Sequence, residues 1–197
     1  MGDSRYQVHQ SNSTAKNSGS SQQSAKMGFR QQCIVQKKTD CKFVVPDNPK
    51  ASGAEPIYEI GALSSVDHYA ALIDKAATAT AVDARLIRAI MYMETTHGYY
   101  DAPLALLGIN KSILPMNINV SYWGSTFGDR TALSKPENNI MAGAEILKRL
   151  IKNLPPDATV RQIATLYNNL NATAVNDYGA RVEKIYETQP WKRKASQ

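Results

Sequence analysis

The stretch from residue 82 to residue 101 most constrains what this chain can fold into. Apolar side chains recur there at the spacing of one helix face, at Leu86, Ile87, Ile90 and Met91. Asp83 precedes the run and can cap a helix, because its side chain accepts a hydrogen bond from an otherwise unpaired backbone N–H. Gly98 follows the run, and glycine commonly ends a helix. We therefore expect an amphipathic helix between Asp83 and Gly98.

Glu94 is the exception on this apolar face, because it lies four residues after Ile90 and seven after Ile87. We expect its carboxyl group to be partly desolvated and to lie in the last turn, at the negative end of the helix dipole. Both effects raise the pKa of a carboxyl group. A carboxylic acid that stays neutral at neutral pH is suited to protonating a glycosidic oxygen. Taken alone, the pattern favours a simpler role, a glutamate at a helix end that bonds to nearby backbone.

Composition narrows the possible partners. The formal net charge is +6 and the pI is about 9.3, which suits nucleic acid, an anionic membrane or an acidic polymer such as peptidoglycan. No cluster of Lys and Arg with interleaved aromatic residues is present, so nucleic acid is not favoured. No apolar run approaches the roughly 20 residues of a membrane span.

The start of the sequence lacks the pattern of a secretory signal peptide. The chain is then either cytosolic, a mature or engineered form, or exported by a route other than the general secretory pathway. The basic run at residues 192–194 is most simply a solvated tail.

The chain divides into three parts by composition. Residues 1–56 are expected to be a flexible extension and linker, since residues 1–26 hold almost no large apolar side chains. Residues 57–190 form the folded domain, and residues 191–197 form the tail. The domain is expected to be mainly α, with about five helices, over residues 64–79, 83–97, 136–154, 159–169 and 172–187. Residues 98–135 are expected to be a long loop region with a short strand or helical turn near residues 116–120.

Two short β-like patches, residues 32–35 and 42–45, flank the two cysteines of the chain. A hairpin closed by a Cys33–Cys41 disulfide is one interpretation, and two free thiols in a flexible segment is the other. Two cysteines without nearby histidines do not make a zinc site. We expect no metal ion and no cofactor.

Five segments together resemble the soluble lytic transglycosylase and goose-type lysozyme families. Residues 82–95 read VDARLIRAIMYMET and resemble the family's catalytic helix, in which a Glu is usually followed by Ser. Residues 114–118 read LPMNI and resemble the segment Gly-Leu-Met-Gln-Ile, which lines the saccharide cleft. Residues 136–147 read PENNIMAGAEIL and match the pattern Pro-x-x-Asn-Ile-x-x-Gly-x-x-x-Leu. Residues 164–169 read ATLYNN and resemble Ala-Ala-Tyr-Asn-x-Gly, and residues 178–182, YGARV, resemble the closing helix.

The resemblance covers about residues 65–187 and identifies a divergent member. Thr95 stands where the family has Ser, and Asn117 stands where it has Gln. The family's glycine after Tyr-Asn is absent from residues 169–171, which read NLN.

The resemblance implies a lysozyme-like fold with a saccharide cleft and a defined chemistry. Glu94 would protonate the oxygen between N-acetylmuramic acid and N-acetylglucosamine in peptidoglycan. It would then deprotonate the muramoyl 6-hydroxyl, giving a 1,6-anhydro product without water. Tyr167 would reach the catalytic glutamate or the sugar, and Thr95 and Ile118 would lie at the substrate.

Other side chains are candidates on their own chemistry. Met116, Asn117, Tyr122 and Trp123 suit a saccharide floor, because aromatic faces and amides suit pyranose rings. Asn168 is either a polar contact or a helix-end cap. A hydrolase would need a second carboxylate, for which Asp101 and Asp129 are candidates, and each is also consistent with a turn residue.

The leading hypothesis is therefore a peptidoglycan-cleaving enzyme, a lytic transglycosylase or a muramidase. It would act in the periplasm or cell wall as an exported effector or wall-penetrating enzyme, with secretion machinery and a cognate inhibitor protein as partners. The alternative is a saccharide-binding or structural domain that kept the fold and lost activity. A buried acid at Glu94 argues against that alternative, because an inactive site has no need of one.

Overall fold

The computed structural model describes residues 28–38, 40–54, 62–106 and 112–192. The expectations for residues 1–26 and for the tail beyond residue 192 lie outside these ranges. Nine helices and one two-stranded hairpin make up the described part of the chain, which is therefore mainly helical, as expected. None of the described helices combines the length and hydropathy that crossing a bilayer requires.

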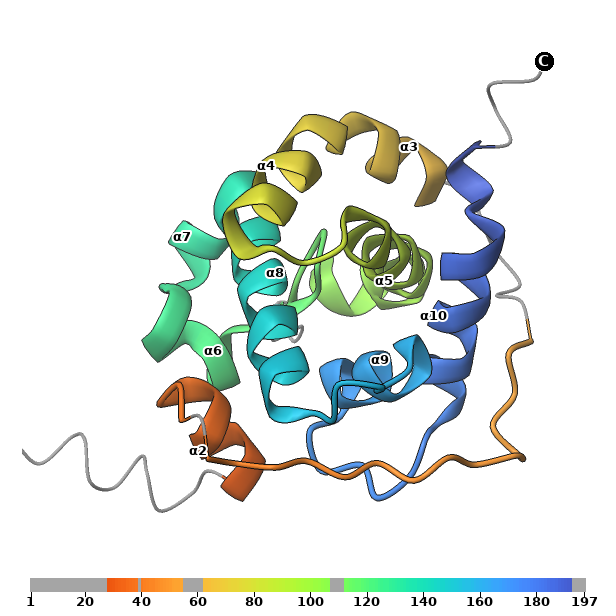
Figure 1. The fold of residues 1–197 in the computed structure, drawn as a ribbon. Helices are drawn as coiled ribbons and strands as arrows, with labels where there is room; N and C mark the ends of the chain where they lie inside the picture. The colour runs from red at the N-terminus through yellow and green to blue at the C-terminus, as the bar shows by residue number, and fades with distance from the viewer. Residues whose placement is uncertain (1–27, 39, 55–61, 107–111, 193–197) are drawn as a thin grey trace, which may run out of the picture.

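Helix α5 (Ala84–Leu106) occupies the centre of the fold. Figure 1 looks nearly along its axis and shows the other long helices arranged around it. Its first half is buried on several sides: Ile87, Ile90, Met91 and Met93 are fully inaccessible to solvent. Asp83 caps this helix as expected, since its side chain accepts a hydrogen bond from the Arg85 N–H at 2.8 Å. The surrounding helices pack on this central helix, because burial of its apolar side chains is favourable.

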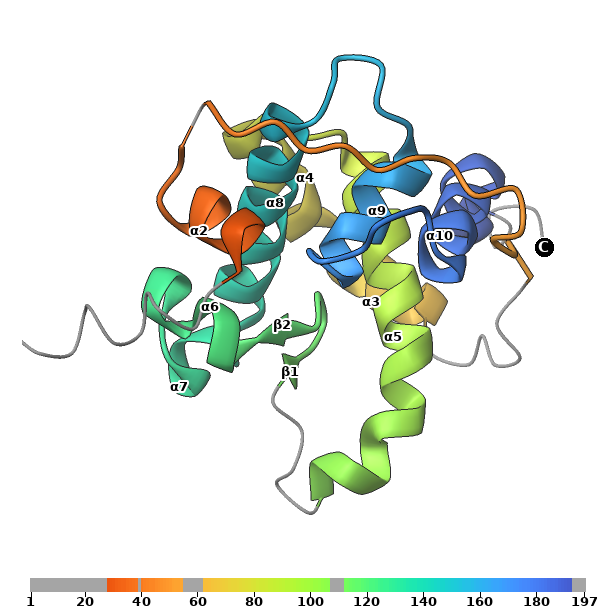
Figure 2. The same ribbon diagram turned by 90° about the horizontal axis from the view of Figure 1, so that it is seen from below.

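The expected end of this helix at Gly98 is wrong. The helix continues to Leu106, and its last turns extend beyond the other elements in Figure 2. A glycine inside a helix costs only about 1 kcal/mol relative to alanine, so it is a weak stop signal. Glu94 consequently lies near the middle of α5 and not in its last turn, so the helix dipole has no role at this residue.

The four further helices that the sequence predicts are present around α5, one of them divided in two, with shifted boundaries. The first expected helix is divided at Tyr69 into α3 (Ala62–His68) and α4 (Ala70–Thr80). Helix α8 (Pro136–Asn153) begins with Pro136 in its first turn and ends before Pro155. Helix α9 (Val160–Asn168) has a capping box between Thr159 and Gln162, and α10 (Asp177–Thr188) is capped by Asn176.

Helices α9 and α10 approach each other closely at Gly179. A Cβ atom at this position would overlap the Thr165 hydroxyl and the Arg161 carbonyl group. Glycine therefore allows the contact between these helices. The preceding residue, Tyr178, is buried and points to the interior.

The expected loop region 98–135 is largely structured. After the end of α5, β1 (Ser112–Ile113) pairs antiparallel with β2 (Ile118–Asn119), with Ile113 opposite Ile118. Helices α6 (Val120–Phe127) and α7 (Arg130–Leu133) follow. Side chains of Asn119 and Asp129 cap these two helices by accepting from Ser121 N–H and Ala132 N–H, which explains why a polar, aperiodic sequence forms helices here.

Residues 28–54, which we call the N-terminal strap, pack against the domain. Residues 32–35 lie in a helix, α2 (Phe29–Val35), so the interpretation of this segment as one strand of a β hairpin is wrong. The disulfide between Cys33 and Cys41 is present. Both cysteines, Ile34, Phe43 and Val45 are buried in the main core. In Figures 1 and 2 the strap runs from α2 past α8 and α9 towards α10.

Backbone and side-chain hydrogen bonds fix the strap along its path. Phe43 N–H donates to the Asn153 carbonyl at 2.7 Å, Gln162 Nε2 donates to the Val45 carbonyl at 2.7 Å, and Ser52 N–H donates to Asp177 at 2.7 Å. The expectation of a flexible extension to residue 56 is therefore corrected for the described residues of the strap.

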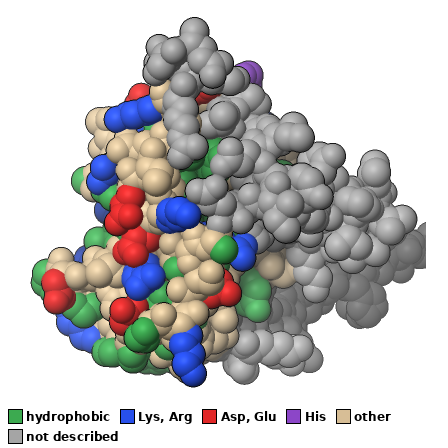
Figure 3. Space-filling model, turned by 90° about the vertical axis from the view of Figure 1, so that its right-hand side faces the viewer, with side chains coloured by type: hydrophobic (Ala, Val, Ile, Leu, Met, Phe, Trp, Pro, Cys, Tyr) green, Lys and Arg blue, Asp and Glu red, His purple; other side chains and the backbone are tan. Residues whose placement is uncertain are grey.

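The charged surface is mixed where it can be seen. On the face shown in Figure 3, Lys and Arg side chains are interspersed with Asp and Glu side chains on the described residues. The described charged side chains on this face therefore form no patch of a single sign.

Candidate functional site

A pocket of about 200 Å³ opens between the central helix, the hairpin, α6, α9 and the strap. Its lining is rich in carboxamide and aromatic side chains. The lining residues are Gln31, Glu94, Asn117, Ile118, Asn119, Tyr122, Trp123, Ile146, Tyr167, Asn168, Asn169, Leu170 and Asn171. Among these described lining residues Glu94 is the only carboxylate, and none is Lys, Arg or His.

Glu94 is 3% exposed, which agrees with its expected position on the buried face of the helix. Asn117 Nδ2 donates to Oε2 of Glu94 at 2.7 Å, and the Tyr178 hydroxyl donates to Oε1 at 2.5 Å. Asn117 lines the pocket, whereas Tyr178 is not among the lining residues. Oε2 is therefore the oxygen on the pocket side, and Oε1 is turned towards α10.

Tyr178 is a site residue for which the sequence analysis predicted no role beyond its place in the closing helix. Burial raises its pKa well above the ordinary value of 10.0, and the negative charge of Glu94 raises it further. The phenol is therefore neutral at neutral pH and acts as a hydrogen-bond donor. The available signal was a tyrosine on an otherwise apolar helix face, since a buried hydroxyl usually has a partner.

Asn117 lies in the turn between β1 and β2. Its φ is 55°, a left-handed conformation that asparagine tolerates better than most residues. The turn is anchored by Asn139 of α8, which is fully buried. Asn139 Oδ1 accepts from Met116 N–H at 2.8 Å, and its Nδ2 donates to the carbonyls of Ile113 and Leu133 at 2.9 and 3.1 Å.

Tyr167 lies beside Glu94 in the pocket lining. Its hydroxyl donates to the Met116 carbonyl at 2.8 Å, so it supports the turn that carries Asn117. Burial raises the pKa of Tyr167 well above 10.0, and the charge of Glu94 contributes in the same direction. Tyr167 is therefore close enough to Glu94 to feel its charge while its hydroxyl bonds to the hairpin.

The other expected substrate contacts divide into two groups. Ile118, Tyr122, Trp123 and Asn168 all line the pocket, and the Tyr122 side chain is half exposed there. Thr95 and Met116 do not line it. The Thr95 hydroxyl donates to its own helix at the Met91 carbonyl, and Met116 is fully buried against Gly143.

Of the two candidates for a second carboxylate, Asp129 does not line the pocket. Asp129 is exposed and caps α7 through the Ala132 N–H. Asp101 lies in α5, and its side chain is outside the described part of the structure. The described residues also hold no group of three His, Cys, Asp or Glu side chains arranged for a metal ion.

The pocket includes residues that the sequence reasoning did not assign. Asn119, Asn169 and Asn171 extend its amide-rich wall, and Gln31 reaches it from the strap. The cluster of asparagines at residues 168–171 was a usable signal, because one short segment places several amides together. Gln31 gave no signal, since it is separated by more than 60 residues from the next lining residue.

Comparison of the chain with protein-family models, with curated proteins and with solved structures finds no match. The interpretation of the pocket therefore depends on the chemistry of its own residues.

Proposed function

We propose that this protein cleaves the β-1,4 bond between N-acetylmuramic acid and N-acetylglucosamine in peptidoglycan, through a lysozyme-like domain with Glu94 as general acid and base. The observation that carries the proposal is the position of Glu94. It is a buried carboxyl group in a pocket wall, bonded by Tyr178 and Asn117, and the described lining residues include no other ionisable carboxyl group.

In the first step, the proton on Oε2 of Glu94 is transferred to the glycosidic oxygen as the C1–O bond breaks. The bond from Asn117 can be kept during this step, because a protonated carboxyl oxygen retains an acceptor lone pair. The bond from Tyr178 holds Oε1 away from the pocket and fixes the orientation of the carboxyl group. The developing positive charge at C1 is then stabilised by the resulting carboxylate.

In the second step, Glu94 acts as base. The 6-hydroxyl oxygen of the muramoyl residue attacks C1, and its proton returns to Oε2 of Glu94. The product is a 1,6-anhydro sugar, no water is consumed, and the enzyme is restored. A single carboxyl group suffices for this sequence, whereas most glycoside hydrolases use two.

The remaining lining residues suit a neutral saccharide. Tyr122 presents an exposed aromatic ring, and the asparagines present donors and acceptors for hydroxyl and acetamido groups. The Cys33–Cys41 disulfide further supports an oxidising compartment, such as the periplasm. There the exported protein would meet the cell wall, and an exporting cell would require an inhibitor protein.

The proposal is tested by mass spectrometry of muropeptides released from purified sacculi. We expect 1,6-anhydromuropeptides. Release of reducing muramic acid alone would assign a muramidase and exclude the single-carboxyl mechanism. Binding to sacculi without any release would favour the alternative saccharide-binding domain.

A further inference from the structure

Helix α2 of the N-terminal strap connects two walls of the pocket. Arg30 Nη1 donates to the carbonyls of Leu170 and Ala172, at 2.9 and 2.7 Å, on the wall formed after α9. Gln31 Nε2 lies 3.4 Å from the Tyr122 carbonyl on the opposite wall, in α6. The strap is therefore part of the pocket, and α2 is clearly separate from the central helix α5 in Figures 1 and 2.

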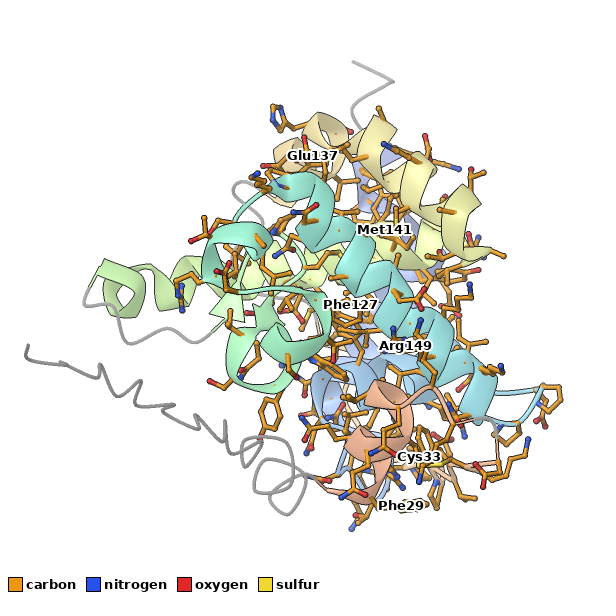
Figure 4. The ribbon with its side chains drawn as sticks, turned by 90° about the vertical axis from the view of Figure 1, so that its left-hand side faces the viewer. Phe29, Cys33, Phe127, Glu137, Met141 and Arg149 are labelled. Atoms are coloured by element: carbon orange, nitrogen blue, oxygen red, sulfur yellow. A yellow bond between two sulfur atoms is a disulfide. The ribbon has the colours of Figure 1, made fainter. Side chains whose placement is uncertain are left out.

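The position of α2 is fixed from behind by α8. Arg149 Nη1 donates to the Ile34 carbonyl at 3.0 Å, its Nε bonds to Glu145 at 3.2 Å, and its guanidinium lies 5.0 Å from the centre of the Phe127 ring. Figure 4 shows Arg149 on α8, with Phe127 and the helix that carries Cys33 on either side. With the disulfide, these contacts hold α2 in one place, so that a side chain on its inner face has a defined position.

Gln31 is the side chain of α2 that faces the pocket, and it is 7% exposed. Its 3.4 Å bond to Tyr122 is longer than the 2.7–3.2 Å typical of protein hydrogen bonds, so it contributes little to holding the helix. The described residues provide no further hydrogen bond to this amide. A buried amide that is only partly bonded can bind a ligand group at little structural cost.

The chemistry of the neighbouring residues indicates what Gln31 would bind. Carboxamide side chains are the most frequent kind in the pocket lining, and none of its described members is basic. The carboxyl group of Glu94 comes from α5 and not from α2. A carboxamide presents an N–H donor and a C=O acceptor side by side in one plane, which is complementary to the C=O and N–H of an acetamido group.

We propose that Gln31 binds the acetamido group of an N-acetylated sugar unit. Helix α2 would thereby make the pocket selective for N-acetylated over unacetylated saccharides. This inference rests on the proposed function, because it takes a saccharide as the ligand of the same pocket. It assigns to the strap a role in substrate selection in addition to its role in packing.

The test measures saccharide binding in the full chain with Glu94→Gln, which prevents turnover. A β-1,4-linked tetramer of N-acetylglucosamine is titrated by calorimetry or NMR, and the matching glucose tetramer shows what the acetamido groups contribute. Gln31→Met removes the amide and keeps the length of the side chain. Gln36→Met is the matched control, because Gln36 is exposed at the end of α2 and does not line the pocket.

We expect Gln31→Met to weaken binding of the acetylated tetramer by ~3- to 10-fold, the usual effect of losing neutral hydrogen bonds, and to leave glucose-tetramer binding unchanged. Gln36→Met should bind both ligands as the parent does. If Gln31→Met fails to fold, Gln31→Glu takes its place, because it keeps the shape of the side chain and removes the N–H donor. We expect the same loss of affinity for the acetylated tetramer. Equal affinity of the folded Gln31 variants and the parent for the acetylated tetramer would overturn the inference.

The two proposals can fail separately. If the wild-type protein releases muropeptides but tetramer binding does not depend on Gln31, the inference fails and the proposed activity stands. If binding depends on Gln31 and the wild-type protein releases nothing from sacculi, Gln31 stands as a saccharide contact and the enzymatic proposal fails.

Discussion

Tyr178 and Glu94 are 84 residues apart in sequence and are joined by a hydrogen bond of 2.5 Å between the phenolic hydroxyl and Oε1. This bond links α10 to the central helix at the carboxyl group on which the proposed chemistry depends. The two carboxyl oxygens of Glu94 therefore have different partners: Oε1 accepts from Tyr178, and Oε2 accepts from the pocket residue Asn117.

Replacing Tyr178 with phenylalanine tests whether its hydrogen bond orients the carboxyl group of Glu94. Tyr178→Phe keeps the ring and removes only the hydroxyl group. We expect the free energy of unfolding to fall by about 0.5–1.5 kcal/mol, the range for a hydrogen bond between neutral groups. Cleavage of sacculi should fall as well, because the carboxyl group loses its orientation. Urea unfolding and a turnover assay on the same preparation measure both effects; unchanged turnover in the folded variant would limit Tyr178 to a structural role.

The pH dependence of stability provides a second test. The pKa values of Tyr167 and Tyr178 are raised well above 10.0 in the folded protein, by burial first and by the charge of Glu94 second. Above pH ~10 the unfolded chain loses these protons while the folded chain keeps them, so stability is complete below that pH and declines as the pH rises.

Each such tyrosine adds about 1.4 kcal/mol per pH unit to the decline. The free energy of unfolding, measured between pH 9 and pH 11.5, should therefore fall less steeply in Tyr178→Phe than in the wild type. Tyr122→Phe is the control, because Tyr122 is 54% exposed. Parallel slopes for all three proteins would contradict the assignment.

The anchoring of the hairpin by Asn139 gives a third prediction. Asn139→Ala leaves the Met116 N–H and the carbonyls of Ile113 and Leu133 without their partner. We expect a loss of about 2–4 kcal/mol in unfolding free energy, since each unsatisfied buried group costs about 1–3 kcal/mol and relaxation recovers part of it.

The neighbouring Asn138→Ala is the matched control. Asn138 is exposed and makes one hydrogen bond, to the Ala132 carbonyl, so its loss should cost below about 1 kcal/mol. Similar losses for the two variants would show that the buried position has no special role in holding the turn.

A fourth prediction concerns the N-terminal strap. A chain that begins at residue 51 lacks Cys33, Ile34, Phe43 and Val45, which are all in the core. Each large apolar side chain contributes about 1.5–3 kcal/mol on burial, so their joint loss approaches the whole net stability of a typical domain. We expect this chain to lack cooperative thermal unfolding, whereas a chain that begins at residue 28 should unfold cooperatively. Cooperative unfolding of the shorter chain, followed by near-ultraviolet circular dichroism, would contradict the role assigned to the strap.

The helices with strong local signals could be predicted from the sequence. Pro136 and the prolines after Leu154 mark the limits of α8, and the apolar face around Ile87 and Ile90 places Glu94 in the interior. These features depend on local spacing and capping, which a sequence shows directly.

The features that were missed depend on distant contacts. Helix α5 continues through Gly98 because a weak local penalty does not stop a long helix. The strap reads as a flexible extension because its apolar residues form two short runs in a polar sequence, although Ile34, Phe43 and Val45 are buried in the core. Tyr178 and Gln31 join the site only because the fold brings α10 and α2 to it.

The most direct test of the central claim is cleavage of sacculi by Glu94→Gln, with thermal unfolding measured on the same preparation. Glutamine fills the same space; its oxygen can accept from Asn117, and its amide group can donate to the Tyr178 oxygen. It cannot supply a proton to a glycosidic oxygen, and general acid–base catalysis contributes about 10²–10⁴-fold. We expect a folded protein with an unchanged or higher Tm and with sacculus cleavage reduced at least to the upper end of that range. A folded Glu94→Gln protein that clears sacculi at nearly the wild-type rate would contradict the proposed function.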